Sequence, residues 1–215
     1  MPERLSVRQA FDLTPEAANR LYSQHVNRGL LGIYRLLGLD RMDVVRAKGA
    51  SLYLADGREI LDFSSAMGIL GLGHNHPRIL AVERAFQDEE RVEALKLAPS
   101  KLQAALAYNL AQVLPKPLQV SFFAVSGAEA VDAAMKLCER VQGPKRRHYI
   151  TAAGSYHGRT HSTLPLTRAP GFDDGFLRTL PSENIVEVRY GVLDDIERAI
   201  RQCTTFDGSH SVIAI

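Results

Sequence analysis

The chain has 215 residues, of which 46% are apolar and 23% are charged, a composition typical of folded globular proteins and not of disordered ones. Its 26 basic and 24 acidic residues leave a net charge of +2, which gives no reason to expect nucleic acid or a membrane surface as a partner. No apolar run approaches the roughly 18 residues of a membrane span, no secretory-type segment opens the sequence, and the two cysteines lack metal or redox spacing. We therefore expect a cytoplasmic protein.

Residues 1–70 are expected to form an N-terminal leader of helices followed by a β-hairpin. Thr14-Pro15 is a good helix start, with the threonine as N-cap and the proline at the first helical position, and the helix should end near Val26. In Ser51–Phe63, apolar residues flank Asp56-Gly57, a two-residue turn signal. This pattern predicts a hairpin.

Residues 71–215 are expected to form the first part of a larger α/β domain. Strand-type apolar runs alternate here with helical periodicity, which predicts a parallel sheet with helices on its faces. Four helices are predicted: one begins at Pro77, one follows Ser100, one covers Ser126–Val141 and one covers about Leu193–Cys203. The predicted strands are Val120–Val125, His148–Thr151, Glu187–Arg189 and Ser211–Ile215. Residues 74–77 are expected to cap the helix that follows them.

The apolar run Ser211–Ile215 has the composition of a buried strand. Such a strand needs hydrogen-bonding and packing neighbours on both sides. We therefore expect this polypeptide to be part of a longer one, or to be completed by another chain.

The run Ser126-Gly127-Ala128-Glu129 joins a strand-type segment to a helix. The first N–H groups of a helix have no internal partners and lie at the positive end of its dipole, so a phosphate monoester would fit there. The same residues, Ser-x-x-Glu, also match a capping box that stabilises a helix without any ligand. The sequence leaves both interpretations open.

A second candidate segment is Gly154–Thr160, which follows the predicted strand at residues 148–151. Because ligands of α/β sheets lie beyond the carboxyl ends of the strands, both segments should open onto one crevice. Tyr156 would offer an aromatic face and His157 a polar group to a planar cofactor with a phosphate tail. The alternative is a plain surface loop. No histidine pair has metal-site spacing, so no metal is expected.

Four stretches of the sequence, taken together and in their order, are highly specific for one protein family. They are the strand pair Leu52–Phe63, the run GLGHNHP at Gly71–Pro77, the run SGAEA at Ser126–Ala130 with the helix after it, and YHGRT at Tyr156–Thr160. From about residue 50 to 215 the chain resembles the N-terminal half of class III (ω-type) aminotransferases, which are pyridoxal-phosphate enzymes of fold type I. The resemblance implies an α/β fold of type I that is incomplete at its C-terminal end.

The resemblance also implies which residues hold the cofactor, pyridoxal 5′-phosphate. Backbone N–H groups of Gly127 and Ala128 would hold its phosphate, with Ser126 adjacent. Tyr156 would stack on the pyridine ring, and His157 and Gly158 would shape the pocket.

The whole enzyme implied by the resemblance is a homodimer that transfers an amino group from an amine or ω-amino acid to a 2-oxo acid. The segment Ser64–Leu70 would lie near the substrate entrance and contribute across the dimer interface. Asn27–Leu30 further resembles the leader of putrescine aminotransferases, and acetylornithine and ornithine aminotransferases are related types.

The departure from the family pattern is as informative as the match. The family uses an Asp that pairs with the pyridine nitrogen and a Lys that forms the Schiff base, both following a Glu-Pro that is absent here. None of the six lysines has such a context. No catalytic residue is therefore assigned, and the chain alone is not expected to turn over. The alternatives are a non-catalytic truncated homologue that acts as a binding or structural module, and an aminomutase or racemase on the same scaffold.

Overall fold

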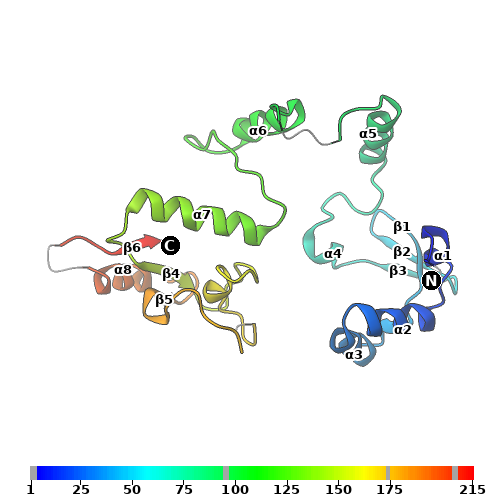
Figure 1. The fold of residues 1–215 in the computed structure, drawn as a ribbon, viewed down its shortest axis with the longest axis horizontal. Coiled ribbons are helices and arrows are strands. Elements are labelled where there is room, and N and C mark those ends of the chain that lie inside the picture. Colours follow the sequence, from blue (N-terminus) through cyan, green and yellow to red (C-terminus); the bar gives the residue numbers. More distant parts are fainter. Residues whose placement is uncertain (1–3, 94–96, 173–174, 205–207) are drawn as a thin grey trace. The chain divides into compact units, whose positions relative to one another are not determined.

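Two three-stranded sheets organise the chain, one in the unit Met1–Lys96 and one in the unit Leu97–Ile215 (Figure 1). The computed structural model describes residues 4–93, 97–172, 175–204 and 208–215. Within these residues, no helix combines the length and the apolar character that a membrane crossing requires.

The first unit combines an antiparallel sheet of order β1-β2-β3 with short helices. Its elements are α1 (Val7–Phe11), α2 (Pro15–His25), α3 (Arg28–Leu36), a 3₁₀ turn η1 (Leu39–Arg41), β1 (Val44–Lys48), β2 (Ser51–Leu54), β3 (Glu59–Leu61), α4 (Ser65–Gly68) and α5 (Pro77–Asp88). The predicted hairpin is confirmed as β2 and β3, whereas β1 was not predicted.

Helix α2 begins as its sequence indicates. The side chain of Thr14 accepts a hydrogen bond from the Ala17 amide, with N to Oγ1 at 3.3 Å, and Pro15 opens α2. The predicted stop is also confirmed, but the chain does not leave the helical conformation for long. Asn27 accepts from the Leu30 amide at 2.9 Å and so caps the next helix, α3.

The second unit contains the predicted parallel sheet, with strand order β5-β4-β6. Its elements are α6 (Lys101–Val113), α7 (Gly127–Gln142), β4 (His148–Ala152), η2 (Leu164–Leu166), η3 (Ser182–Asn184), β5 (Ile185–Val188), α8 (Leu193–Gln202) and β6 (Val212–Ala214). The four predicted helices of the chain from Pro77 onward and three of its four predicted strands are confirmed within a few residues.

The predicted strand Val120–Val125 is wrong. This segment lies outside every strand that the structure describes, and the side chains of Val120 and Val125 are more than nine-tenths exposed. An apolar run becomes a strand only when a neighbouring strand takes its backbone groups, and no described strand pairs with it.

Alternation along β4 divides the core of the second unit between the two faces of the sheet. Tyr149 belongs to a cluster with Met135 of α7, whereas Ile150 belongs to a cluster with Ala199 of α8. Successive strand residues point to opposite faces, so α7 and α8 cover opposite sides of the sheet. The Tyr149 hydroxyl also donates to the Glu139 carboxylate at 2.6 Å, and burial is the main reason that the pKa of this phenol is raised.

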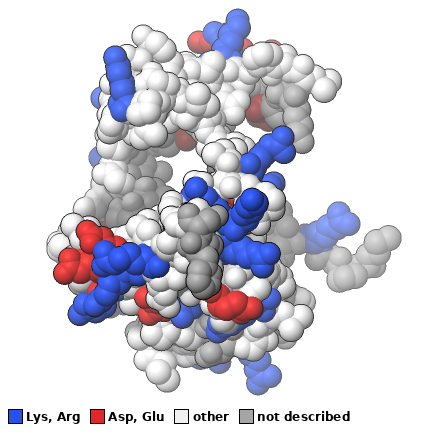
Figure 2. Space-filling view, turned by 90° about the vertical axis from the view of Figure 1, so that its left-hand side faces the viewer, with Lys and Arg blue, Asp and Glu red and all other residues white. Residues whose placement is uncertain are grey.

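The start of α8 is fixed by a buried carboxylate. Asp195 is 6% exposed. Its carboxylate accepts from the Arg189 backbone amide and from the Arg189 guanidinium, through Nε at 2.7 Å and Nη2 at 2.9 Å. The Arg198 guanidinium also bonds to it. Arg189 is the main cause that holds the pKa of this carboxyl well below its usual range. Figure 2 shows basic and acidic side chains lying close together on one face of the molecule, an arrangement that suits local ion pairing.

Candidate functional site

At the N-terminus of α7, side chains of the described residues accept from only some of the backbone amides. The Ser126 hydroxyl accepts from the Glu129 amide at 3.2 Å, which is one half of the predicted capping box. The Glu129 carboxylate takes the Val125 amide at 2.8 Å instead of the amide of Ser126, so the reciprocal half does not form. Among the described residues, the amides of Gly127 and Ala128 have no acceptor. Both therefore remain available at the positive end of the helix dipole.

The loop after β4 turns back toward this helix start. The Arg168 amide donates to the Ser155 carbonyl at 2.8 Å, and the His157 amide donates to the Thr167 hydroxyl at 3.1 Å. Thr167 in turn donates to the Gly158 carbonyl at 2.7 Å. These bonds fix the path of the turn that carries Tyr156.

Gly158 is the point at which this loop contacts α7. Its φ is +117°, and a Cβ built there would lie 2.5 Å from the Cβ of Ala128 and 2.9 Å from the hydroxyl of Thr163. A side chain at this position would meet both an unfavourable backbone conformation and a steric overlap. The close approach of loop and helix therefore requires glycine.

All six of the predicted cofactor-binding residues line one pocket. This pocket, of about 460 Å³, is bounded by Ser126, Gly127, Ala128, Val131, Tyr156, His157, Gly158, Arg159 and Thr160. Its volume falls within the range of small-molecule sites, about 300–1,000 Å³. The structure thus brings the helix start and the aromatic loop together, as the order of strands and loops predicts.

The orientations of two pocket side chains follow from their contacts. Tyr156 is 56% exposed, and its ring meets Phe172 edge-on, with ring centroids 5.6 Å apart. His157 Nε2 lies 3.2 Å from the Thr151 hydroxyl. Because that hydroxyl gives its single hydrogen to the Leu166 carbonyl, we assign the hydrogen between Thr151 and His157 to Nε2.

Sequence reasoning missed the residues that hold the loop in place. Thr163 and Thr167 are almost completely buried, and Phe172 supports the tyrosine. Buried threonines within the run Thr160–Thr167 have no spacing that distinguishes them from an ordinary polar loop. The described residues contain no group of three or more histidine, cysteine, aspartate or glutamate side chains that could hold a metal ion.

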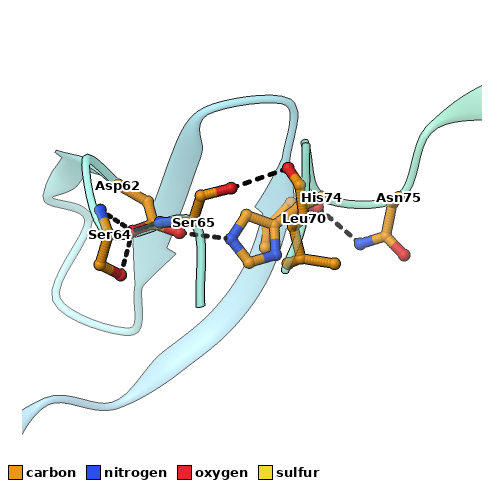
Figure 3. Close-up of polar contacts among 7 residues, drawn as sticks. Asp62, Ser64, Ser65, Leu70, His74 and Asn75 are labelled. Atoms are coloured by element: carbon orange, nitrogen blue, oxygen red, sulfur yellow. Dashed lines mark hydrogen bonds and ion pairs between the residues drawn. The ribbon is translucent and has the colours of Figure 1, made fainter. Parts of the chain in front are cut away.

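The first unit carries a separate polar network around Asp62 (Figure 3). The Asp62 carboxylate accepts from the amide and hydroxyl of Ser64 and from the amide of Ser65, at 2.7–3.0 Å. Its other oxygen lies 2.8 Å from Nε2 of His74. The Ser64 hydroxyl, followed by His74, is the main cause that holds the pKa of Asp62 well below its usual range.

This network anchors the segment Ser64–Leu70, which has an unusual backbone. Residues 65–68 all have positive φ, from +48° at Ser65 to +85° at Gly68, and three of them are not glycine. The Ser65 hydroxyl spans the turn by donating to the Leu70 carbonyl at 2.7 Å (Figure 3). Strained backbone of this kind persists only where surrounding contacts fix it.

The expectation that residues 74–77 cap α5 is wrong for the side chains. His76 occupies the N-cap position but makes no side-chain capping bond. His74 instead contacts Asp62, and Asn75 donates to the Ala47 carbonyl at 2.8 Å. Both side chains therefore hold the loop to the β-sheet of the first unit.

The fold and the motifs define a class of protein. The family model described as "Aminotransferase class-III" matches residues 38–206. The chain therefore belongs to the class III aminotransferase family, whose members depend on pyridoxal 5′-phosphate and have the α/β architecture of fold type I.

The chain is similar in sequence to aminotransferases of known name. The chain is 31% identical over 160 residues to putrescine aminotransferase of Pectobacterium atrosepticum, a match that covers 74% of this chain and 34% of the relative. It is 37% identical over 168 residues to acetylornithine aminotransferase of Streptomyces coelicolor, covering 78% of this chain and 40% of the relative. The chain thus spans well under half the length of these curated relatives.

Solved structures share the fold at lower identity. Ornithine aminotransferase from Toxoplasma gondii, which has partial occupancy of PLP at its active site, superposes with a TM-score of 0.75 at 19% identity, covering 99% of this chain and 48% of that one. Taurine:2-oxoglutarate aminotransferase from Bifidobacterium kashiwanohense was solved in complex with PLP and glutamate. It superposes with a TM-score of 0.69 at 23% identity, covering 94% of this chain and 47% of that one.

The contact between Gly158 and Ala128 predicts a large cost for adding one methyl group. Gly158→Ala combines a strained backbone with a steric overlap, and it should lower the free energy of unfolding by about 2–4 kcal/mol. Gly154→Ala is the matched control, because Gly154 also has positive φ but a Cβ there meets nothing within 4 Å. Urea unfolding of both variants measures the difference, and equal losses would show that the approach to the helix is not tight.

The Asp62 network predicts a specific acid sensitivity. Because the folded-state pKa of Asp62 is lowered, its contribution to stability is fully present above the unfolded pKa of about 4 and is lost as the pH falls through the folded value. Asp62→Asn should therefore be less stable than wild type at pH 7, with a smaller difference at pH 3. The exposed Asp12→Asn is the control. A difference between Asp62→Asn and wild type that does not change with pH would contradict the ionic role of this carboxylate.

Proposed function

We propose that this chain supplies the part of a pyridoxal-phosphate-dependent aminotransferase that grips the cofactor's phosphate and faces its ring. The observation that carries the proposal is one pocket. In it the Gly127 and Ala128 amides, which have no acceptor among the described residues, lie together with the exposed Tyr156. An anion fits the helix start, and a flat aromatic group fits the tyrosine face.

The residues that line the pocket suit pyridoxal 5′-phosphate in charge and size. The Gly127 and Ala128 amides would donate to phosphate oxygens, with the Ser126 hydroxyl beside them. A Cβ at Gly127 would meet nothing within 4 Å outside its chain neighbours and the backbone of its own helix, so the space beside this residue is open. Tyr156 would lie against the ring, while His157 and Gly158 shape the wall. When bound, the cofactor acts as an electron sink for the carbon that carries the transferred amine.

The reaction proposed for the whole enzyme is transfer of an amino group from an amine or ω-amino acid to a 2-oxo acid. The relatives named for putrescine, acetylornithine and ornithine support this substrate class. An aminomutase on the same scaffold is the alternative reaction, and product analysis of the complete enzyme separates the two.

We infer that these 215 residues do not complete the reaction alone. No described lysine lines the pocket: Lys136 lies further along α7 and lines a different hollow with Phe122 and Phe123. The amine that moves the proton and the carboxylate that pairs with the pyridine nitrogen would come from polypeptide beyond this sequence. Without them the chain would act as a binding module.

A homodimer and a cytoplasmic location complete the proposal. In the segment Ser64–Leu70, Met67 and Ile69 are 95% and 80% exposed, and the adjacent Phe63 is 93% exposed, which supports a role for this segment at a subunit interface near the substrate entrance. Cys138 and Cys203 are both free, as expected for a reducing compartment.

The proposal predicts a binding defect from one substitution in the helix start. Gly127→Leu would place a bulky side chain in the open space beside the Gly127 and Ala128 amides, and it should weaken binding of 4′-deoxypyridoxine 5′-phosphate at least about tenfold. This analogue has no aldehyde, so it does not react with surface lysines. Calorimetric titration measures the affinity, with Gly32→Leu as control, because Gly32 also lies in a helix with open space around it. Unchanged affinity in Gly127→Leu would overturn the phosphate assignment.

A further inference from the structure

Thr167 lies directly after η2 and is 1% exposed. Its hydroxyl makes two bonds to the pocket turn at once: it accepts from the His157 amide at 3.1 Å and donates to the Gly158 carbonyl at 2.7 Å. One side chain thus satisfies both a donor and an acceptor of the same turn. Neither group has another acceptor or donor among the described residues.

These bonds lie on the C-terminal side of Tyr156. On its N-terminal side, the Ser155 carbonyl accepts from the Arg168 amide at 2.8 Å. Tyr156 is therefore held at both neighbours by consecutive residues, Thr167 and Arg168. The Tyr156 ring has one described aromatic neighbour, Phe172, and the residue as a whole is 56% exposed.

The backbone path, more than packing around the ring, decides where the ring lies. The Thr167 bond to the Gly158 carbonyl also orients the glycine that touches Ala128. A change in this bond would move the turn relative to the free amides of α7. Two halves of the pocket, the ring face and the helix start, are set against each other through one hydroxyl.

We propose that Thr167 is a positioning residue of the cofactor site, whose hydroxyl sets the distance between the Tyr156 ring and the N-terminus of α7. It does not line the pocket. The inference rests on the proposed function, because it assigns Thr167 a role toward the ligand of that site. A merely structural role would require volume at this position; the positioning role requires the hydroxyl.

Two substitutions separate these roles. Thr167→Val keeps the shape and removes both hydrogen bonds, whereas Thr167→Ser keeps the hydroxyl and removes a methyl group. Thr204→Val is the control, because the Thr204 hydroxyl bonds to the Ile200 carbonyl at the exposed end of α8. All variants are made in the 215-residue chain.

The first readout is hydrogen exchange of the His157 amide without any ligand, with the Ile150 amide of β4 as an internal reference for unfolding. The valine variant should exchange at His157 at least about tenfold faster, and the serine variant should stay within about threefold of wild type. The second readout is the affinity for 4′-deoxypyridoxine 5′-phosphate, with about tenfold weaker binding in the valine variant only.

Equal exchange at His157 in the valine and serine variants would overturn the proposal. So would equal affinity of these two variants for an analogue that the wild-type chain binds, or a valine variant indistinguishable from Thr204→Val. If Thr167→Val also accelerates exchange at Ile150, Thr167→Ala replaces it in the same comparison with serine. Failure of the wild-type chain to bind the analogue would count against the proposed function alone, because exchange at His157 still decides whether the hydroxyl holds the turn.

Discussion

The candidate site depends on one close contact, that of Gly158 with Ala128. A loop that follows β4 and a helix that precedes it in sequence meet there without side-chain space between them. Parallel strands make this possible, because their carboxyl ends and the starts of neighbouring helices share one edge of the sheet. The contact places the exposed Tyr156 beside backbone amides for which no described residue supplies an acceptor. The proposed grip on a phosphate and the proposed ring contact follow from that juxtaposition.

Local sequence signals were sufficient wherever a single residue decides the structure. The side chains of Thr14 and Ser126 each cap the start of a helix by accepting a hydrogen bond from a backbone amide. Asp56-Gly57 forms the turn of the β2–β3 hairpin. They were insufficient where partners are distant. Val120–Val125 has strand composition but no described strand beside it. His74 Nε2 lies within hydrogen-bond distance of Asp62, twelve residues away, and does not cap the next helix. The order of motifs predicted which residues line the pocket, whereas the threonines that support the loop carry no local pattern.

The two units divide the work differently. The second unit holds the pocket and most of the buried core, with a sheet covered by α7 on one side and α8 on the other. The first unit holds a strained segment, residues 65–68, through the carboxylate of Asp62. Membership in the class III family links both to one enzyme architecture, of which this chain spans about half the length in the matched structures. We propose that this chain binds the cofactor's phosphate but does not supply the lysine that bonds to the cofactor. That proposal is consistent with a chain that covers about half of the matched structures.

The most direct measurement is the backbone amide NMR spectrum of the chain titrated with 4′-deoxypyridoxine 5′-phosphate. Hydrogen bonding to phosphate oxygens should move the Gly127 and Ala128 amide protons downfield together, and stacking should shift the Tyr156 ring signals at the same ligand concentrations. Saturable shifts elsewhere that leave these two amides in place would contradict the account, because the ligand would then occupy a different part of the molecule.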